Sequence, residues 1–248
     1  CSVQQQTLDD WELLVVDGCS TDNTCQIISE IQESDPRVRL IVNYNDTGPA
    51  HARSTGIIAS QGEYLAFLDG DDLWISSKLN DQIAFMRKSK CDFSYTQYRV
   101  MNKEGTQASQ TLTMRSQFGF WTALSFRGIA TPTVIAKRAL FTEDILKTIG
   151  LPHGEDYVWW LLVLRKGILA SGLMMPLSLY RDSDTSLSKN RIKHLKCVWQ
   201  SYRILLDINA TVAFVAFISY TTDVMFRRLR YKLLTKVYGT LKVRELMK

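Results

Sequence analysis

The chain has 248 residues, of which 46% are hydrophobic and 22% are charged, so it can form one large α/β domain or a domain with a small appendage. These proportions exclude a globally disordered chain and a collagen-like chain. The five cysteines are scattered, form no C-x-x-C pair and have no histidines at metal-ligand spacing. This pattern argues against a disulfide framework and favours the reduced thiols of a cytosolic protein.

The net charge of +5 is distributed unevenly. From Arg203 to the end, nine basic residues stand against three acidic ones, a net charge of +6, so the remainder carries −1. The basic character therefore belongs to the C-terminal tail and bears on the partner of that tail. The chain begins at Cys1 without a visible signal peptide, in a stretch (residues 2–7) that we interpret as part of a helix, and we expect a segment to precede it.

The first ninety residues alternate between apolar β-type runs and helical segments. Buried strands are predicted at residues 12–16 (ELLVV), 38–42 (VRLIV) and 64–68 (YLAFL). Helices are predicted at residues 20–33, 49–61 and 76–88. This order predicts a mostly parallel central sheet flanked by helices. Ligands bind outside the carboxyl ends of the strands in such sheets, so the acids that follow the first and third strands should share one rim.

The second part of the chain is less regular. A strand is predicted at residues 92–101, a turn at 102–105, a strand at 131–136 and an apolar helix at 157–164. The tail from Tyr202 onward is predicted to be helical throughout. Its apolar stretch (residues 210–220) is much shorter than the ~20 residues needed to span a bilayer.

The strongest chemical feature is the run of acids directly after the third predicted strand. Asp69, Asp71 and Asp72 repel one another unless a cation or hydrogen-bond donors compensate. A hard divalent cation, Mn²⁺ or Mg²⁺, takes oxygen ligands and usually also holds substrate phosphates. The alternative is that one of these acids, above all Asp72, caps the following helix, although a cap needs only one acid.

Other side chains have a functional and a structural interpretation. Asp17 could accept hydrogen bonds from a base or ribose, or it could form an ordinary Asp-Gly turn. Arg53 could reach a diphosphate, or it could be solvated. Glu155 and Asp156 open the apolar helix. They could be first-turn acids that the helix dipole favours, or one of them could act as a general base. His153 is left without a role.

Two tryptophans, Trp159 and Trp160, follow this acid pair. Most such aromatics belong to the core, but one could face a sugar.

Taken together, these residues resemble the family 2 glycosyltransferases. The resemblance covers about residues 2–190 and rests on the segments at 6–12, 14–24 (LVVDGCSTDNT), 48–56 (GPAHARSTG), 62–74 (GEYLAFLDGDDLW), 154–157 (GEDY), 180–181 and 186–188. It is similar to the glycosyltransferases of bacterial surface polysaccharide assembly, including the teichuronic-acid type. The sequence departs from the family pattern at Gly18 and Cys19, at Asp182-Ser183, and in lacking the family's first strand before Cys1.

The resemblance implies a GT-A fold, Rossmann-like and with a mostly parallel sheet, over residues 1–190, and a helical extension over residues 191–248. It also implies inversion at the anomeric carbon and a nucleoside-diphosphate sugar donor. A UDP-sugar is expected, with a hydroxyl of a lipid-linked glycan as acceptor. The donor would be bound by Asp17, Arg53, Asp69 and Gly70, the metal by Asp71 and Asp69, and the base would be Asp156, with Glu155 beside it.

Two alternatives remain open. The chain could bind a sugar nucleotide without turnover, because the first strand is absent, or it could be a nucleotidyltransferase, although the pair Glu155-Asp156 favours glycosyl transfer. The sugar, linkage and acceptor are not encoded in any motif. No nucleic acid partner is expected.

The apolar and basic tail has two interpretations as well. It could dock on the inner leaflet of the plasma membrane, which would make the protein cytoplasmic and peripheral and would bring it to a lipid-linked acceptor. Alternatively, it could be a helix that packs on its own domain.

Overall fold

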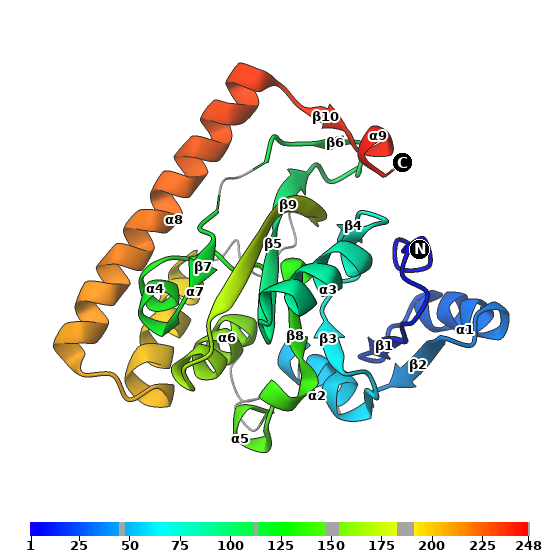
Figure 1. Cartoon of the computed structure of the whole chain (residues 1–248), viewed down its shortest axis with the longest axis horizontal. Helices are drawn as coiled ribbons and strands as arrows, with labels where there is room; N and C mark the ends of the chain where they lie inside the picture. The colour runs from blue at the N-terminus through cyan, green and yellow to red at the C-terminus, as the bar shows by residue number, and fades with distance from the viewer. Residues whose placement is uncertain (45–47, 112–113, 147–153, 183–190, 248) are drawn as a thin grey trace.

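The computed structural model describes residues 1–44, 48–111, 114–146, 154–182 and 191–247. In these residues, helices pack around an eight-stranded sheet, the first two strands of the chain form a separate two-stranded sheet, and one long helix runs along an edge of the molecule (Figure 1). The α/β class expected from the sequence is confirmed. The expected boundary at residue 190 and the motif at 186–188 lie outside the described residues.

The first third of the chain follows the predicted order of strands and helices, except that an additional short strand, which the sequence does not predict, precedes the third helix. Its elements are β1 (Leu13–Asp17), α1 (Thr24–Ser34), β2 (Val38–Val42), α2 (Pro49–Ala59), β3 (Tyr64–Ala66), β4 (Leu73–Trp74) and α3 (Lys78–Ser89). β1 and β2 pair in parallel because α1 carries the chain back between them. Pro49 begins α2, where its fixed φ suits the first turn, and follows Gly48 with a φ of +126°.

The middle of the chain contributes most of the sheet. Its elements are β5 (Phe93–Met101), β6 (Gln107–Ala108), β7 (Gln117–Phe118), α4 (Phe120–Ser125), the 3₁₀ helix η1 (Thr131–Thr133), β8 (Ile135–Lys137), the 3₁₀ helix η2 (Arg138–Leu140), α5 (Glu143–Leu146), α6 (Glu155–Arg165) and β9 (Ala170–Arg181). The strand predicted at 131–136 is only partly correct, since its first residues form η1. Pro132 lacks the N–H that a strand ladder requires.

The strand pairing is mixed, so the prediction of a mostly parallel sheet is wrong. Among the described strands, β1 pairs with β2 and β5 with β9 in parallel, whereas β3 and β5 both pair with β8 in antiparallel fashion. β6 also runs antiparallel to β5, because the turn at 102–105 joins them directly. The regular alternation of strand and helix that favours parallel pairing breaks down after α3, because β5, β6 and β7 follow one another without a helix between them.

The N-terminal segment also differs from the prediction, because residues 2–5 form turns rather than a helix. The buried side chain of Gln6 explains the difference. Its Nε2 donates to the carbonyl oxygen of Ile75 at 2.8 Å, and its Oε1 accepts from the N–H of Leu79 at 2.9 Å. The segment is thereby tied across the beginning of α3 instead of continuing as a helix.

The C-terminal tail is not helical throughout, contrary to the prediction. It contains α7 (Arg191–Gln200), a short π-helix (Ser201–Leu205), α8 (Ala210–Tyr238), β10 (Leu241–Lys242) and α9 (Val243–Leu246). Asp207, with a φ of +44°, separates the π-helix from α8, and Gly239, with a φ of +69°, ends α8. β10 then pairs with β6, so the tail returns to the sheet.

None of the described helices combines the length and the apolar character that are needed to cross a membrane.

The main hydrophobic core lies between the sheet, α6 and the inner side of α8. Trp159 and Trp160 are both fully buried there, so they are core residues and not sugar-facing ones. Ala213, Ala216 and Tyr220 of α8 are buried in the same cluster. Since burying apolar surface is the main stabilising term in folding, α8 is integral to this core.

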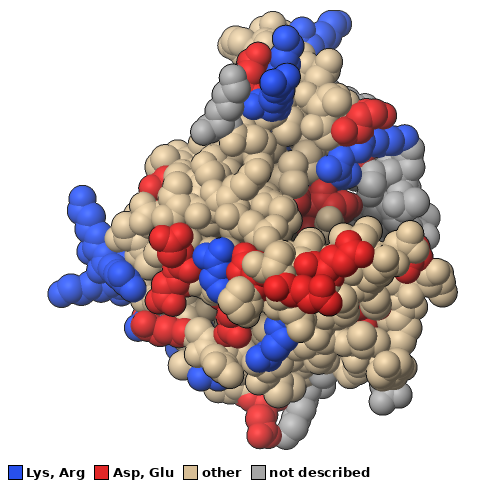
Figure 2. Space-filling view, turned by 90° about the vertical axis from the view of Figure 1, so that its right-hand side faces the viewer, with Lys and Arg blue, Asp and Glu red and all other residues tan. Residues whose placement is uncertain are grey.

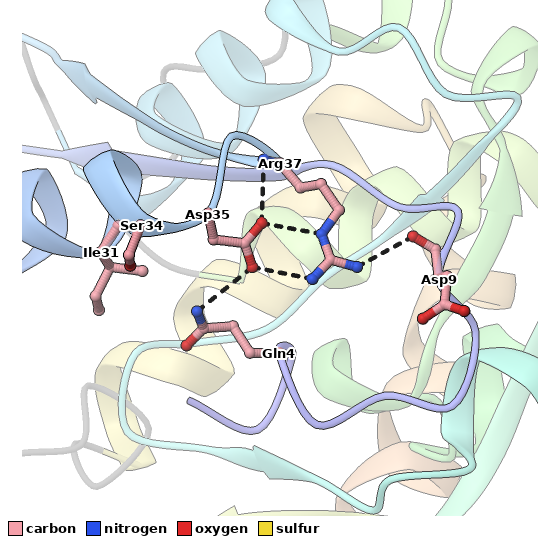
Figure 3. Close-up of polar contacts among 6 residues, drawn as sticks. All are labelled: Gln4, Asp9, Ile31, Ser34, Asp35 and Arg37. Carbon is pink, nitrogen blue, oxygen red and sulfur yellow. Dashed lines mark hydrogen bonds and ion pairs between the residues drawn. The ribbon is translucent and has the colours of Figure 1, made fainter.

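The N-terminal segment is fastened to the beginning of β2 by an ion pair between Asp35 and Arg37 (Figure 3). Arg37 Nε and Nη2 donate to Asp35 at 2.9 and 3.0 Å, and Nη1 donates to the carbonyl oxygen of Asp9 at 3.2 Å. Gln4 also donates to Asp35, and the guanidinium lies over the ring of Trp11. The hydrogen bonds from Arg37 lower the pKa of Asp35 to about 2.

We expect Arg37→Gln to lower the thermal midpoint, Tm, by a pH-dependent amount. Because the folded pKa of Asp35 lies below its ordinary value, the ion pair stabilises fully above about pH 4, and this stabilisation is lost as the pH falls through about 2. The difference in Tm between the two proteins, measured from acidic to neutral pH, should therefore shrink toward low pH. In an Asp35→Asn background the effect of Arg37→Gln should not vary with pH. A pH-independent difference in the unmodified background would contradict this account.

Candidate active site

The acids after β3 form a tight turn, in which the N–H of Asp72 donates to the carbonyl oxygen of Asp69 at 3.0 Å. The carboxylates of Asp69 and Asp71 reach solvent, whereas Asp72 is buried. None of them caps a helix, because the turn leads into β4, and Ser77 occupies the N-cap position of α3. Gly70 is exposed, and a Cβ there would meet no atom, so its backbone leaves room for a ligand.

Asp72 is anchored to the end of β9, far away in the sequence. Its Oδ1 accepts from the N–H of Arg181 at 2.8 Å, and the Nε of Arg181 donates to the carbonyl oxygen of Asp71 at 2.8 Å. Its other oxygen is buried without a hydrogen-bond partner among the described residues. Burial, together with the charges of Asp69 and Asp71, raises the pKa of Asp72 to about 8. Asp72 is therefore largely protonated at neutral pH.

Arg53 of α2 reaches across to the acid turn. Its Nη2 lies 2.6 Å from Oδ1 of Asp69, and 19% of the arginine side chain and 37% of the aspartate side chain are exposed. The pairing answers the question of whether Arg53 is merely solvated, because the guanidinium is held at the candidate site. It also places a positive charge beside a carboxylate that still reaches solvent.

Asp156, in the first turn of α6, is the second centre of the site. Its Oδ2 accepts from Oγ1 of Thr131 at 2.5 Å, and its Oδ1 accepts from the N–H of Tyr157 at 2.7 Å. Burial opposes ionisation, but the charge of Arg53, the Thr131 hydrogen bond and the charge of Arg127 outweigh it, so the pKa of Asp156 lies below its usual value. Asp156 is therefore an ionised acceptor at neutral pH that lies deep among protein atoms and still contacts solvent.

The side chain of Glu155 and the whole of His153 lie outside the described residues. The role expected for Glu155 therefore stays a prediction.

The helix η1, which carries Thr131, is held by buried polar groups. The carbonyl oxygen of Pro132 accepts from Nε1 of Trp74 at 2.8 Å, and that of Thr133 accepts from Nε2 of Gln82 at 2.9 Å. Gln82 in turn accepts from the buried Nζ of Lys78 at 2.8 Å. Because Trp74 lies in β4, which follows the acid turn, this network connects the two centres of the site. No sequence pattern indicates the network, and the sequence predicts Thr131 at the start of a strand.

Asp17, at the end of β1, is buried, and its carboxylate accepts hydrogen bonds from residues that follow it closely in the sequence. Its oxygens accept from the N–H and Oγ of Ser20, at 2.8 and 2.5 Å, and from Sγ of Cys25 at 3.3 Å. The hydrogen bonds from Ser20 lower the pKa of Asp17. Within the described residues no hydrogen bond or ion pair joins Asp17 to Asp69, Arg53 or Asp156, which the structure does bring together. Asp17 thus has a structural role, and its contact with a nucleoside stays a prediction.

We expect Thr131→Val to raise the pKa of Asp156, because it removes a hydrogen bond that favours the ionised carboxylate. Thr131→Ser keeps the hydroxyl and should keep the pKa low. The valine variant should also lose roughly 1.5–3 kcal/mol of unfolding free energy, the usual cost of losing a hydrogen bond to a charged group. Carboxyl ¹³C NMR titrations, assigned with Asp156→Asn, and urea unfolding measure the two effects. An unchanged pKa in the valine variant would contradict the role of Thr131.

Comparison with known proteins identifies the family. The profile described as Glycosyl transferase family 2 matches residues 1–150. The chain is 32% identical over 228 residues to TuaG of Bacillus subtilis (strain 168), a protein named for glycosyl transfer in teichuronic acid biosynthesis, with 92% of this chain and 90% of TuaG covered. It is 36% identical over 199 residues to the Escherichia coli UDP-Glc:alpha-D-GlcNAc-diphosphoundecaprenol beta-1,3-glucosyltransferase WfgD, with 80% and 76% covered.

A solved structure shows the same fold. The mannosyltransferase PcManGT from Pyrobaculum calidifontis, in complex with GDP-Man and Mn²⁺, matches 88% of this chain and 64% of its own with a TM-score of 0.63, at 16% identity. The central sheet with flanking helices is therefore a GT-A fold. The chain belongs to Glycosyl transferase family 2 and is a glycosyltransferase.

Proposed function

We propose that this protein moves a sugar from a nucleoside-diphosphate sugar, a UDP-sugar, to a hydroxyl of a lipid-linked glycan in bacterial surface polysaccharide synthesis, with inversion. The observation that carries the proposal is the ionised carboxylate of Asp156, held close to the pair of Arg53 and Asp69. The names of TuaG and WfgD support the pathway and the class of acceptor. The UDP-Glc in the name of WfgD supports the nucleotide, although PcManGT was solved with GDP-Man.

In this proposal Asp156 is the general base. Its carboxylate accepts the proton of the acceptor hydroxyl, whose oxygen then attacks the anomeric carbon as the bond to the diphosphate breaks. A single displacement of this kind inverts the anomeric configuration. The low pKa of Asp156 keeps it ready to accept that proton at neutral pH, and Glu155 is the second candidate for the same role.

Asp69, Gly70 and Arg53 form the donor side of the proposed site, with Asp17 at the nucleoside. Arg53 is suited to a diphosphate because its planar guanidinium donates two parallel hydrogen bonds to phosphate oxygens. Its present partner, Asp69, is a carboxylate with the same geometry of acceptors. The open space over Gly70 lets a ligand approach the backbone closely.

Asp71 and Asp69 are the proposed ligands of Mn²⁺ or Mg²⁺. They fit such an ion because both carboxylates are accessible, and hard oxygen ligands are what these cations prefer. The described residues contain no group of three or more metal-ligating side chains, which suits a cation whose remaining ligands are substrate phosphates and water. Bound there, the cation would neutralise charge on the leaving diphosphate.

The test is a transfer assay with a panel of UDP- and GDP-sugars, with and without Mn²⁺, on a lipid-linked sugar acceptor. Asp156→Asn should lower kcat by about 10²- to 10⁴-fold, the usual contribution of a general base, with the donor still bound. Asp71→Ala should remove the dependence on metal together with most of the turnover. Asp10→Ala, at an exposed acid of the N-terminal segment, is the matched control. ¹H NMR of the product should give the inverted anomer, and retention, or donor binding without transfer, would overturn the proposal.

We further propose that the outer face of α8 docks on the inner leaflet of the plasma membrane, which makes the protein peripheral there. The outer face consists of exposed apolar side chains along the whole helix, among them Phe214, Ile218, Met225, Phe226, Leu229 and Leu233. Five basic residues lie between positions 227 and 236, and Asp223 is the only acid in α8. Anionic lipid complements such a helix through both its charge and its acyl chains.

Two features of the molecule support this orientation. An apolar cavity of about 680 Å³, lined by Trp121, Leu169 and Val212 among others, lies beside the beginning of α8. α8 runs along one edge of the molecule in Figure 1, and the face on the opposite side carries a band of acidic side chains across its middle (Figure 2). An anionic surface would therefore attract the edge with α8 and not that face.

Vesicle co-sedimentation with anionic lipids tests the docking. The double variant Phe226→Glu/Leu229→Glu should bind about tenfold more weakly or worse, because it puts charge where apolar area is buried in lipid. Ile58→Glu changes an equally exposed apolar residue on α2 and should bind normally. Raising the salt concentration should weaken binding of the unmodified protein. Equal sedimentation of the double variant and the unmodified protein would refute the docking.

A further inference from the structure

Arg127 lies where three helices converge. The proposed function gives it no role in binding the donor or the metal. The three helices are α4, α6 and α8, and α4 lies between the other two in Figure 1. Tyr157 of α6 binds them together, because its hydroxyl donates to the carbonyl oxygen of Ala123 in α4 at 3.0 Å. Its ring lies 5.4 Å from that of Tyr220 in α8. Since Asp156 precedes Tyr157 directly, the convergence point adjoins the proposed base.

The backbone at Arg127 is fixed from two sides. Its N–H donates to Oδ2 of Asp223 in α8 at 3.1 Å. The next residue, Gly128, packs so closely on Phe118 that a Cβ there would lie 2.0 Å from the ring. A turn held in this way presents the same side chain in the same place, which is the condition for a preorganised binding group.

The guanidinium of Arg127, by contrast, is not engaged. The side chain reaches solvent, and no described residue forms an ion pair or a hydrogen bond with its guanidinium. Arg53 differs in this respect, because its Nη2 lies 2.6 Å from Oδ1 of Asp69. Five N–H donors and a full positive charge are therefore available for a ligand close to the base.

The electrostatics agree with this placement. The nearby Tyr220 raises the pKa of Arg127 despite opposing burial, and Asp156, Tyr98 and Tyr180 add to the effect. The charges of Arg53 and Arg127 both lower the pKa of Asp156. The proposed base thus lies within electrostatic reach of two arginines. Arg53 is paired with the donor-side acid, whereas the guanidinium of Arg127 has no hydrogen bond or ion pair among the described residues.

We propose that Arg127 binds the phosphate group attached to the acceptor sugar and thereby directs the acceptor hydroxyl to Asp156. The inference rests on the proposed function, in which the acceptor is lipid-linked and carries its sugar on a diphosphate. An acceptor whose hydroxyl meets the base must place the rest of its sugar, and the anionic group on that sugar, around Asp156. The guanidinium of Arg127 is the unpaired cation in that position among the described residues, and its fork suits phosphate oxygens.

Tyr98 and Tyr180 lie within electrostatic reach of Arg127 and complete the proposed acceptor site. Their rings are 6.3 Å apart in a T-shaped arrangement, and both are only half-buried. Aromatic faces of this kind pack on the apolar face of a sugar ring and carry hydroxyl groups that can bind its oxygens. The site would therefore combine two sugar-facing rings with one phosphate-binding arginine.

The first experiment measures transfer to two acceptors, a sugar diphospho-lipid and an alkyl glycoside of the same sugar without phosphate. Arg127→Gln should raise KM for the diphosphate acceptor about 10- to 100-fold, the cost of a lost charge-assisted hydrogen bond. It should change KM for the alkyl glycoside and for the donor little. Arg127→Lys should restore part of the affinity, and Arg244→Gln, an exposed arginine of α9, should behave like the unmodified protein. Equal losses with both acceptors, or none, would overturn the proposal.

A binding experiment separates this inference from the proposed function. Calorimetric titration of a sugar 1-phosphate, with UDP present in excess, requires no turnover. The unmodified protein should bind it, Arg127→Gln should bind it at least tenfold more weakly, and the sugar without phosphate should bind both proteins equally. If transfer fails in every protein but this difference holds, the proposed function is wrong and the phosphate site stands. If Arg127→Gln binds the sugar 1-phosphate normally, the phosphate site is wrong.

Discussion

A carboxylate that stays ionised among protein atoms needs hydrogen-bond donors and positive charge around it, and the arrangement around Asp156 meets this constraint. Burial alone would favour the neutral form. The hydroxyl of Thr131 and the charges of Arg53 and Arg127 reverse that preference. Thr131 lies in η1, Arg53 in α2 and Arg127 just after α4, so these elements and α6 must all be in place for the carboxylate to stay ionised.

The same constraint has a different outcome at the acid turn. Asp72 is buried close to Asp69 and Asp71, and its pKa rises to about 8. It therefore serves as an anchor for Arg181, while its two neighbours keep accessible carboxylates. In this short acidic run, Asp72 thus has a structural role, whereas the accessible carboxylates of Asp69 and Asp71 are suited to a ligand. The difference depends on burial, which the local sequence does not predict.

The sequence was sufficient for the parts of the fold that local periodicity determines. The runs at 12–16 and 38–42 and the intervening helix predicted β1, α1 and β2 correctly, because a strand-helix-strand order leaves parallel pairing as the simple outcome. Beyond α3 the same logic failed. The pairing of β8 between β3 and β5, and the return of β10 to β6, depend on contacts between distant residues. The local patterns of a single sequence do not predict such contacts.

The site divides in the same way. The sequence indicates Asp69 and Asp156 because acids at strand ends and helix starts have a recognisable chemistry, and it indicates Arg53 because a guanidinium suits a diphosphate; the structure groups all three. Thr131 and Arg127 were missed, since a threonine and an arginine in an irregular stretch carry no signal of their own. The buried network behind η1 shows how Thr131 is held, and the hydrogen bond from the N–H of Arg127 to Asp223 shows how the backbone at Arg127 is held.

The central claim is that Asp156 faces the reacting carbon of a donor held by the acid turn. A crystal structure with an intact, non-transferable UDP-sugar analogue and Mn²⁺ tests it most directly. The account predicts that the cation binds Asp71 or Asp69 together with diphosphate oxygens. It also predicts that the carboxylate of Asp156 lies on the side of the anomeric carbon opposite the diphosphate, with space for an acceptor hydroxyl between them. A donor whose anomeric carbon turns its diphosphate side toward Asp156, or a cation bound away from the acid turn, would contradict it.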